Sequence, residues 1–263
     1  MTRIVAIANQ KGGVGKTTTA VNLAASVAAS ERPVLLVDVD PQSNASGGLG
    51  IGPQPLEESI YAALVGEASL KSLLRQTELG SLHLVPSGPD LYGAEIELAG
   101  REDRFHLLHR ALEPIAHEYD TIFIDCPPSL GLLTLNALCA ARSVLIPMQC
   151  EYYALEGLTQ LSRTVDMVRS GPNPDLEVEG VLLTMFDGRN NLSRQVAEDV
   201  RENFVGKVFR SVIPRNVRLS EAPSFGKPII LYDIDSRGCQ SYLDLAKEFL
   251  DQKPGGAQAA GAP

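Results

Sequence analysis

A glycine-rich loop near the start of the chain carries the residues best suited to bind a phosphorylated ligand. Its candidate nucleotide-binding positions are Lys11, Gly12, Gly13, Val14, Gly15, Lys16, Thr17 and Thr18. Glycines let successive backbone N–H groups point at an anion, and a following helix adds the positive end of its dipole. Lys16 would hold the β- and γ-phosphates of a nucleotide, and the Thr17 hydroxyl would bind Mg²⁺. The loop therefore predicts a phosphate cradle.

Lys11 is a second lysine in this loop, and it marks a departure from the general P-loop pattern. That pattern has a glycine five residues before Gly15, where this chain has Gln10. One lysine is enough to neutralise a nucleotide held by one subunit. We therefore hypothesise that Lys11 reaches a nucleotide bound to a facing copy of the chain. A solvated surface charge is the alternative that the spacing alone leaves open.

Two carboxylates follow the apolar run that comes after this loop. The run at 33–42 ends in Asp38, Asp40 and Pro41, and the alternation of an extended chain points both acids the same way. An acid just beyond a strand end, beside a phosphate loop, can orient an attacking water or hold a magnesium-bound water. The alternative interpretation is an aspartate that caps a helix or forms the turn before the proline.

Asp125 ends another apolar run and is the second candidate for this chemistry. It follows Thr121–Ile124 and precedes Cys126, Pro127 and Pro128. A carboxylate at this point accepts hydrogen bonds from a Mg²⁺-bound water in nucleotide-hydrolysing proteins. The prolines restrict the following loop, so that it can move as a unit when the γ-phosphate is present or absent.

Apolar runs alternate with amphipathic stretches, which predicts the elements that position these residues. Strands are expected at 4–8, 33–42, 82–86, 120–125, 143–148, 178–185 and 207–213. Helices are expected at 19–29, 57–65, 69–76, 91–98, 103–117, 132–140, 155–169 and 236–251, and a mobile loop at 43–50. The pattern predicts a single α/β domain, a mostly parallel twisted sheet with helices on both faces. Ligand would bind at the carboxyl ends of the strands.

Composition sets the broad class. The 263 residues are 44% hydrophobic and carry a net charge of −9, which argues against a protein that coats nucleic acid over its whole surface. No apolar run approaches the ~20 residues of a membrane span, and no signal pattern is present, so a cytosolic protein is expected. The four cysteines form no Cys-x-x-Cys pair and are expected to be buried thiols. We expect the domain to cover 1–251 and the Gly/Ala/Pro-rich tail at 252–263 to be disordered.

The charge balance reverses between Asp187 and Arg218. Seven cations face four anions there, and the cations are Arg189, Arg194, Arg201, Lys207, Arg210, Arg215 and Arg218. A basic patch for a polyanion and a solvated helix face both explain this count. Within the segment, the loop Pro214–Asn216 follows a short strand and could form a wall beside the base of a nucleotide.

The loop from Lys11 to Thr18 resembles the deviant Walker A motif of the ParA/MinD superfamily of P-loop ATPases. More narrowly, the chain resembles chromosomal ParA proteins of the Soj type. The resemblance is also carried by the stretches 35–42, 125–129, 149–157 and 213–224, of which the last two are far more specific than any P-loop. It covers nearly the whole chain, and only the tail and parts of 50–80 fall outside it.

This resemblance implies an ATP-driven switch that segregates chromosomes or plasmids. ATP and Mg²⁺ would close two subunits into a homodimer, with Lys11 reaching the partner's phosphates. The dimer would bind double-stranded DNA without sequence preference, which implies a cytoplasmic, nucleoid-associated protein. Slow hydrolysis, stimulated by a ParB-type centromere-binding partner, would release it. No membrane contact is implied.

The resemblance also implies roles for individual residues. Lys11, Lys16 and Asp40 would be catalytic, with Asp40 positioning the attacking water. The metal site would comprise Thr17, Asp40 and Asp125. The adenine end of the nucleotide would contact Pro214 and Asn216, and DNA would contact Arg189 and Arg218.

Two other classes share the phosphate loop. A MinD-like membrane-associated positioning ATPase would need a membrane-seeking C-terminal helix, and the tail lacks the cation-rich amphipathic pattern of such a helix. A metabolic or iron–sulfur relative would need a substrate pocket or a cluster-binding cysteine pair.

Overall fold

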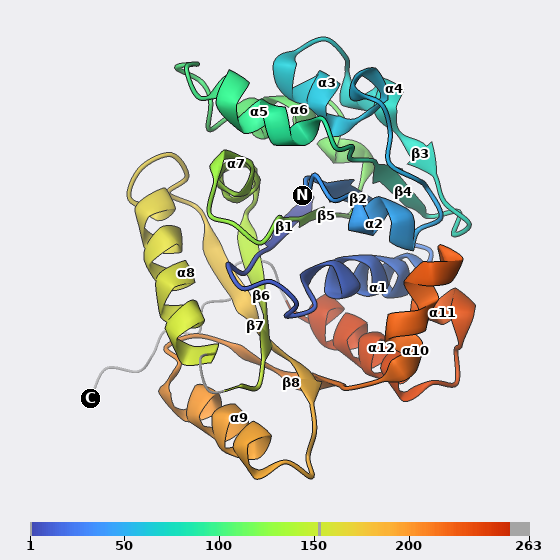
Figure 1. Ribbon diagram of the computed structural model, residues 1–263, viewed down its shortest axis with the longest axis vertical. Coiled ribbons are helices and arrows are strands. Elements are labelled where there is room, and N and C mark those ends of the chain that lie inside the picture. Colours follow the sequence, from blue (N-terminus) through green and yellow to red (C-terminus); the bar gives the residue numbers. More distant parts are fainter. Residues whose placement is uncertain (1, 152–153, 253–263) are drawn as a thin grey trace.

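The computed structural model describes residues 2–151 and 154–252, and one eight-stranded sheet organises them (Figure 1). The strands are β1 (Arg3–Ile7), β2 (Val34–Asp38), β3 (Arg75–Gln76), β4 (Leu82–Val85), β5 (Thr121–Asp125), β6 (Ser143–Gln149), β7 (Glu177–Phe186) and β8 (Val208–Pro214). Their order in the sheet is β3-β4-β2-β5-β1-β6-β7-β8. All neighbours are parallel except β3 and β4, which confirms the predicted mostly parallel sheet.

Helices cover both faces of this sheet, as predicted. The longer ones are α1 (Lys16–Ala28), α5 (Leu91–Leu98), α7 (Leu132–Ala140), α8 (Ala154–Arg169), α9 (Asn191–Asn203) and α12 (Arg237–Leu250). The shorter ones are α2 (Asn44–Gly48), η1 (Leu56–Glu58), α3 (Ile60–Val65), α4 (Leu70–Leu73), α6 (Leu107–Leu112), η2 (Ala116–Glu118), α10 (Val217–Glu221), η3 (Ala222–Phe225) and α11 (Ile229–Tyr232).

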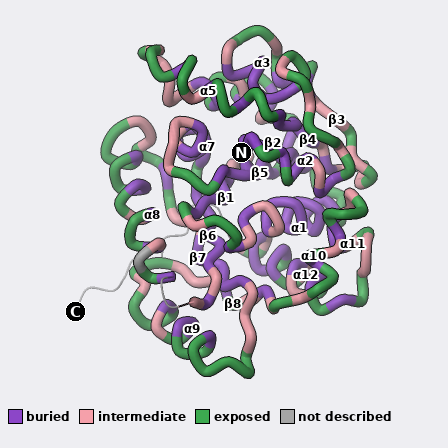
Figure 2. The backbone as a smooth tube through the Cα atoms, in the orientation of Figure 1, coloured by how far each residue is buried: buried purple, intermediate pink, exposed green. Residues whose placement is uncertain are grey.

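Two hydrophobic cores lie on opposite faces of the sheet, and successive residues of each strand alternate between them. In β1, Val5 and Ile7 belong to the core beneath α1 and α12, whereas Ala6 belongs to the core beneath α5, α7 and α8. The central strands are therefore buried on both faces (Figure 2). This explains why their sequences are continuous apolar runs.

The structure differs from the predicted elements in several places, and no helix was predicted where α9 lies. The segment 43–50 was expected to be a mobile loop, but it contains the short helix α2. The predicted helix at 69–76 ends at Leu73, and the next residues form the antiparallel edge strand β3. The predicted helix at 103–117 is reduced to α6 and η2, because Asn136 of α7 accepts the backbone N–H groups of Leu107 and Leu108 and fixes the start of α6 there.

The remaining expectations concern the cysteines, the membrane and the tail. All four cysteines are buried free thiols, as expected. Across residues 2–151 and 154–252, no helix combines the length and the apolar character that a bilayer span requires. The tail residues 253–263 lie outside the described residues, so their predicted disorder and the domain boundary at 251 stay predictions.

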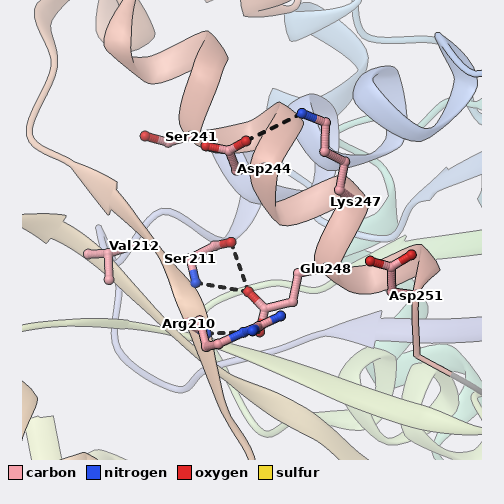
Figure 3. A pocket seen from close by; sticks show the side chains of 8 residues that line it. All are labelled: Arg210, Ser211, Val212, Ser241, Asp244, Lys247, Glu248 and Asp251. Carbon is pink, nitrogen blue, oxygen red and sulfur yellow. Dashed lines mark hydrogen bonds and ion pairs between the residues drawn. The ribbon is translucent and has the colours of Figure 1, made fainter.

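Glu248 is a buried carboxylate on the inner face of α12. Its two oxygens accept hydrogen bonds from the backbone N–H groups of Arg210 and Ser211, each at 2.9 Å, and from the Ser211 hydroxyl at 2.8 Å (Figure 3). These N–H groups lie where the register between β7 and β8 shifts. Burial alone would raise the pKa of Glu248, but these hydrogen bonds outweigh it and lower that pKa. Glu248 therefore satisfies donors that the irregular strand leaves without a partner.

Glu248→Gln is expected to lower the free energy of unfolding at pH 7 by about 1–3 kcal/mol, because a neutral amide accepts these bonds less well. A carboxyl with a depressed pKa stabilises the fold above its unfolded pKa, and that contribution is lost as pH falls through the folded value. The difference from the parent should therefore narrow below about pH 4. Urea unfolding of both proteins at several pH values measures this difference in the free energy of unfolding.

Asp244→Asn is the matched control, because it neutralises an exposed acid one turn earlier on the same helix. It should leave the free energy of unfolding within about 0.5 kcal/mol of the parent. A Glu248→Gln deficit that stayed constant from pH 7 to pH 3 would show that charge is not its cause.

Candidate nucleotide-binding site

The glycine loop forms an open cradle between β1 and α1. Gly13 and Gly15 have φ values of 72° and 85°, in the left-handed region that favours glycine. Gly15 is the N-cap of α1, so the helix begins at Lys16 and not at Thr19 as the sequence pattern predicted. The first N–H groups of α1 consequently face the loop, where they can bind an anion.

Two side chains fix the shape of this loop, one just before it in the sequence and one from β7. Asn9 accepts a hydrogen bond from the Lys11 backbone N–H at 3.0 Å and donates one to the Pro147 carbonyl at 2.8 Å. Thr184 of β7 donates to the Val14 carbonyl at 2.8 Å. Neither Asn9 nor Thr184 was among the predicted site residues. Asn9 is adjacent to the motif, whereas only the folded sheet shows that Thr184 lies beside it.

The two lysines of the loop occupy different environments. Lys16 is buried, and its Nζ donates to the Lys11 carbonyl at 3.1 Å. Burial lowers the pKa of Lys16, and the nearby carboxylates Asp125 and Asp40 partly oppose that shift. The Nζ of Lys11 instead lies 2.8 Å from an oxygen of Glu151, in an ion pair whose side chains are 41% and 47% exposed. Lys16 therefore belongs to the interior of the cradle and Lys11 to its rim.

Three carboxylates gather at this edge of the sheet, and two of them, Asp125 and Asp40, lie near Lys16. Asp38 and Asp125 are register partners on the neighbouring strands β2 and β5, and both are fully buried, while Asp40 is nearly so. Burial, together with the charge of Asp40, raises the pKa of Asp38 to about 6 despite three hydrogen bonds that oppose the shift. Burial and then the Asp38 charge raise the pKa of Asp125 well above its usual range, although Thr17 and Lys16 oppose this.

The carboxylate of Asp125 fits a magnesium site with water ligands. Neither of its oxygens has a well-formed hydrogen-bond partner among the described residues, which is rare for a buried carboxylate. In the same part of the chain, no three Asp, Glu, His or Cys side chains gather closely enough to enclose a metal by themselves. Mg²⁺ keeps several waters and takes few protein ligands beside phosphate oxygens. Thr17 and Asp125 have the donor chemistry for that arrangement.

The loop that follows Asp125 lies against the phosphate cradle. A Cβ added to Gly12 would lie 4.0 Å from the Cβ of Pro128. The structure therefore brings the Asp125 loop and the glycine loop together, as the sequence predicted from their positions after strands.

Pro214 and Asn216 lie farther along the same edge of the sheet. Pro214 ends β8, and the Asn216 side chain caps α10 by accepting the Leu219 backbone N–H at 3.3 Å. The neighbouring strand β7 contacts the loop through Thr184, so these residues follow the strand next to the one that touches the loop. No hydrogen bond among the described residues joins them to the loop, so their predicted contact with adenine stays a prediction.

The two candidate DNA-binding arginines follow neighbouring strands. Arg189 comes just after β7 and pairs with Asp187 at 3.1 Å, with 92% of its side chain exposed. Arg218, on α10 after β8, pairs with Glu221 at 2.9 Å and Asp233 at 3.2 Å. Both arginines therefore lie at the carboxyl edge of the sheet, although the structure places acids against each.

Not every cation of the segment 187–218 is available at the surface. Lys207 is half-buried, its Nζ lies 4.3 Å from the centre of the Phe209 ring, and burial lowers its pKa. The other six cations are exposed, and they are Arg189, Arg194, Arg201, Arg210, Arg215 and Arg218.

Asp125→Asn is expected to raise the melting temperature of the nucleotide-free, Mg²⁺-free protein at pH 7. A carboxyl whose folded pKa is raised costs stability as pH rises above its unfolded value, and the amide removes that cost. A gain of about 1 kcal/mol corresponds to about 2–4 °C for a chain of this size. Asp120→Asn, an exposed acid beside the same strand, is the control. A lower melting temperature for Asp125→Asn alone would contradict this account.

Known proteins share both the sequence and the fold. Residues 2–178 match a family model described as an AAA domain. A Myxococcus xanthus (strain DK1622) protein named "Chromosome partitioning protein ParA" is 62% identical over 248 residues, covering 94% of this chain and 88% of that protein. The Bacillus subtilis (strain 168) protein named "Sporulation initiation inhibitor protein Soj" is 58% identical over 248 residues, covering 94% of this chain and 98% of that protein.

A solved structure extends this similarity to the fold. The Mycobacterium smegmatis protein named cobyrinic acid a,c-diamide synthase was crystallised with a bound ATP analogue and magnesium. It superimposes with a TM-score of 0.84 at 39% identity, covering 95% of each chain. Together with the identity to the two partitioning proteins, this agrees with the resemblance seen in the glycine loop. The chain therefore belongs to the ParA/MinD superfamily of P-loop ATPases, and within it to the chromosome-partitioning ParA/Soj type.

Proposed function

We propose that this chain is an ATP-dependent dimerising switch for chromosome or plasmid partitioning. One observation carries the proposal: the loop has one lysine inside the cradle and a second one at its rim. Lys16 suffices for a nucleotide held by its own subunit. Lys11 is then available for a nucleotide held by a facing copy, which supports a dimer with two ATP molecules between the subunits.

The residues around the cradle are suited to ATP hydrolysis. Lys16 and the backbone of Gly12–Gly15 would bind the phosphates, Thr17 would bind Mg²⁺, and Asp125 would accept a hydrogen bond from a Mg²⁺-bound water. Bound Mg²⁺ would neutralise charge on the phosphate oxygens. One oxygen of Asp40 accepts the Gln42 backbone N–H at 2.9 Å. The other would accept a proton of the attacking water and orient it.

The ion pair between Lys11 and Glu151 can be exchanged at small cost. Both side chains are partly exposed, and exposed pairs contribute about 0–1 kcal/mol. A triphosphate on a facing subunit offers Lys11 more negative charge than one carboxylate. Dimer formation would thus replace an internal ion pair with a contact between subunits.

DNA binding would follow from dimerisation. Each subunit presents exposed arginines after β7 and β8, within a chain whose net charge is −9. One such patch is weak, but two patches on a dimer bind a continuous polyanion together. Affinity would depend on nucleotide and fall steeply with salt. ParB-stimulated hydrolysis would separate the subunits and release the DNA, giving a cytoplasmic protein that associates with the nucleoid.

The DNA half of this proposal predicts binding to a random-sequence duplex with ATP, and much weaker binding with ADP or no nucleotide. Arg189→Glu/Arg218→Glu is expected to weaken binding at least about tenfold and to flatten its salt dependence, since each phosphate contact contributes about 0.9 to the slope. Fluorescence anisotropy at two salt concentrations measures both effects.

Arg32→Glu/Arg110→Glu is the matched control for charge. It changes the net charge equally at two partly exposed arginines, one before β2 and one on α6. Equal loss of binding in the two double variants, or binding that ignored nucleotide, would contradict the proposed DNA face.

The dimer half predicts opposite effects for two variants of the nucleotide site. Lys11→Ala should bind ATP yet remain a monomer, because the facing phosphates lose their cation. Asp40→Ala should form a dimer that persists, because it cannot hydrolyse ATP. Light scattering after gel filtration measures the mass of each variant with ATP, and phosphate release measures its hydrolysis rate. Lys71→Ala, at an exposed lysine, is the control. Hydrolysis by Asp40→Ala at the parental rate would show that its assigned role is wrong.

A further inference from the structure

A single buried carboxylate holds both ends of the segment that carries Asp40. One oxygen of Asp38 accepts the Asp40 backbone N–H at 3.1 Å. The other accepts two hydrogen bonds from Ser46, from its backbone N–H at 2.9 Å and from its hydroxyl at 2.7 Å. Asp38 therefore fastens the start of this segment and the middle of α2 to the end of β2.

Ser46 extends this connection to a second strand. Its hydroxyl oxygen accepts the backbone N–H of Ser87 at 3.1 Å, just beyond the end of β4. Asp38, Ser46 and Ser87 are all fully buried. The hydroxyl of Ser46 thus donates to the Asp38 carboxylate at the end of β2 and accepts the Ser87 N–H beyond β4. Because the three residues are buried, water does not compete for either bond.

The helix α2 is short and depends on its surroundings. It has five residues, its N-cap Ser43 lies in the left-handed region with φ of 55°, and no side chain among the described residues caps it. A helix this short does not hold itself together. Its position, and with it the position of Asp40, consequently depends on contacts such as those of Ser46.

We infer that Ser46 is a positioning residue for ATP hydrolysis, because its hydroxyl bridges Asp38 and Ser87 and so fixes the segment that carries Asp40. This inference rests on the proposed role of Asp40. Ser46 makes no hydrogen bond to the phosphate loop among the described residues; Asn9, just before that loop, and Thr184 of β7 maintain its shape. Loss of the Ser46 hydroxyl should therefore impair the hydrolytic step and spare nucleotide binding.

Ser46→Ala is the cleanest variant for the test. It removes the hydroxyl, retains the backbone N–H that bonds to Asp38, and changes no charge. Ser26→Ala on α1 is the matched control, because the Ser26 hydroxyl is also buried but has no hydrogen-bond partner within residues 2–151 and 154–252. Asp38→Asn keeps the shape of the carboxylate and tests the hydrogen bonds between Asp38 and Ser46 by changing their acceptor.

The measurements are the hydrolysis rate at saturating ATP, the affinity for a non-hydrolysable ATP analogue, and hydrogen exchange of residues 40–48. In Ser46→Ala the rate is expected to fall about 10- to 100-fold, as for a misplaced catalytic group. The affinity should stay within about twofold of the parent, and exchange at 40–48 should accelerate. Ser26→Ala should match the parent in all three.

A rate in Ser46→Ala as high as that of Ser26→Ala would overturn the inference, and so would a loss of affinity equal to the loss of rate. Should Ser46→Ala not fold, Asp38→Asn decides by the same criteria. Asp40→Ala, measured alongside, distinguishes a failure of the proposed role of Asp40 from a failure of the inferred role of Ser46. Parental hydrolysis by Asp40→Ala overturns the proposed role of Asp40, whereas an inactive Asp40→Ala beside a fully active Ser46→Ala overturns only the role of Ser46.

Discussion

The burial of three carboxylates at one edge of the sheet, beside a single buried lysine, is the constraint on which the site depends. Asp38, Asp40 and Asp125 lie with Lys16 at the carboxyl edge of a parallel sheet, where burial raises the pKa of two of these acids. Such an excess of buried negative charge is unfavourable until a divalent cation or a rearrangement compensates it. A bound Mg²⁺ would supply that compensation.

The sequence predicted those parts of the molecule in which local pattern and tertiary structure agree. Continuous apolar runs identified the central strands, and the glycine spacing identified the cradle, because Gly13 and Gly15 adopt φ values that few other residues tolerate. The same pattern placed Asp125 beside the loop correctly, since parallel strands bring their carboxyl ends to one edge.

The missed features depend on contacts between distant segments. A run of Ser, Asn and Gly at 43–50 favours a loop, yet Asp38 and Ser87 hold α2 in place through Ser46. Glu248 lies on the buried face of α12, where periodicity favours an apolar residue, because an irregular strand 38 residues away supplies its donors. Neither partner can be identified from one chain before the sheet order is known.

The two ends of the sheet have a consequence for how this protein can assemble. Exposed sheet edges invite other chains to add strands, which leads to uncontrolled polymerisation. Here one edge is the two-residue strand β3, and the other is β8, whose irregular backbone already donates to Glu248. Among the described residues, neither edge offers a long row of free donors. Copies of the chain that meet at high local concentration are thereby kept from adding strands to one another's sheets.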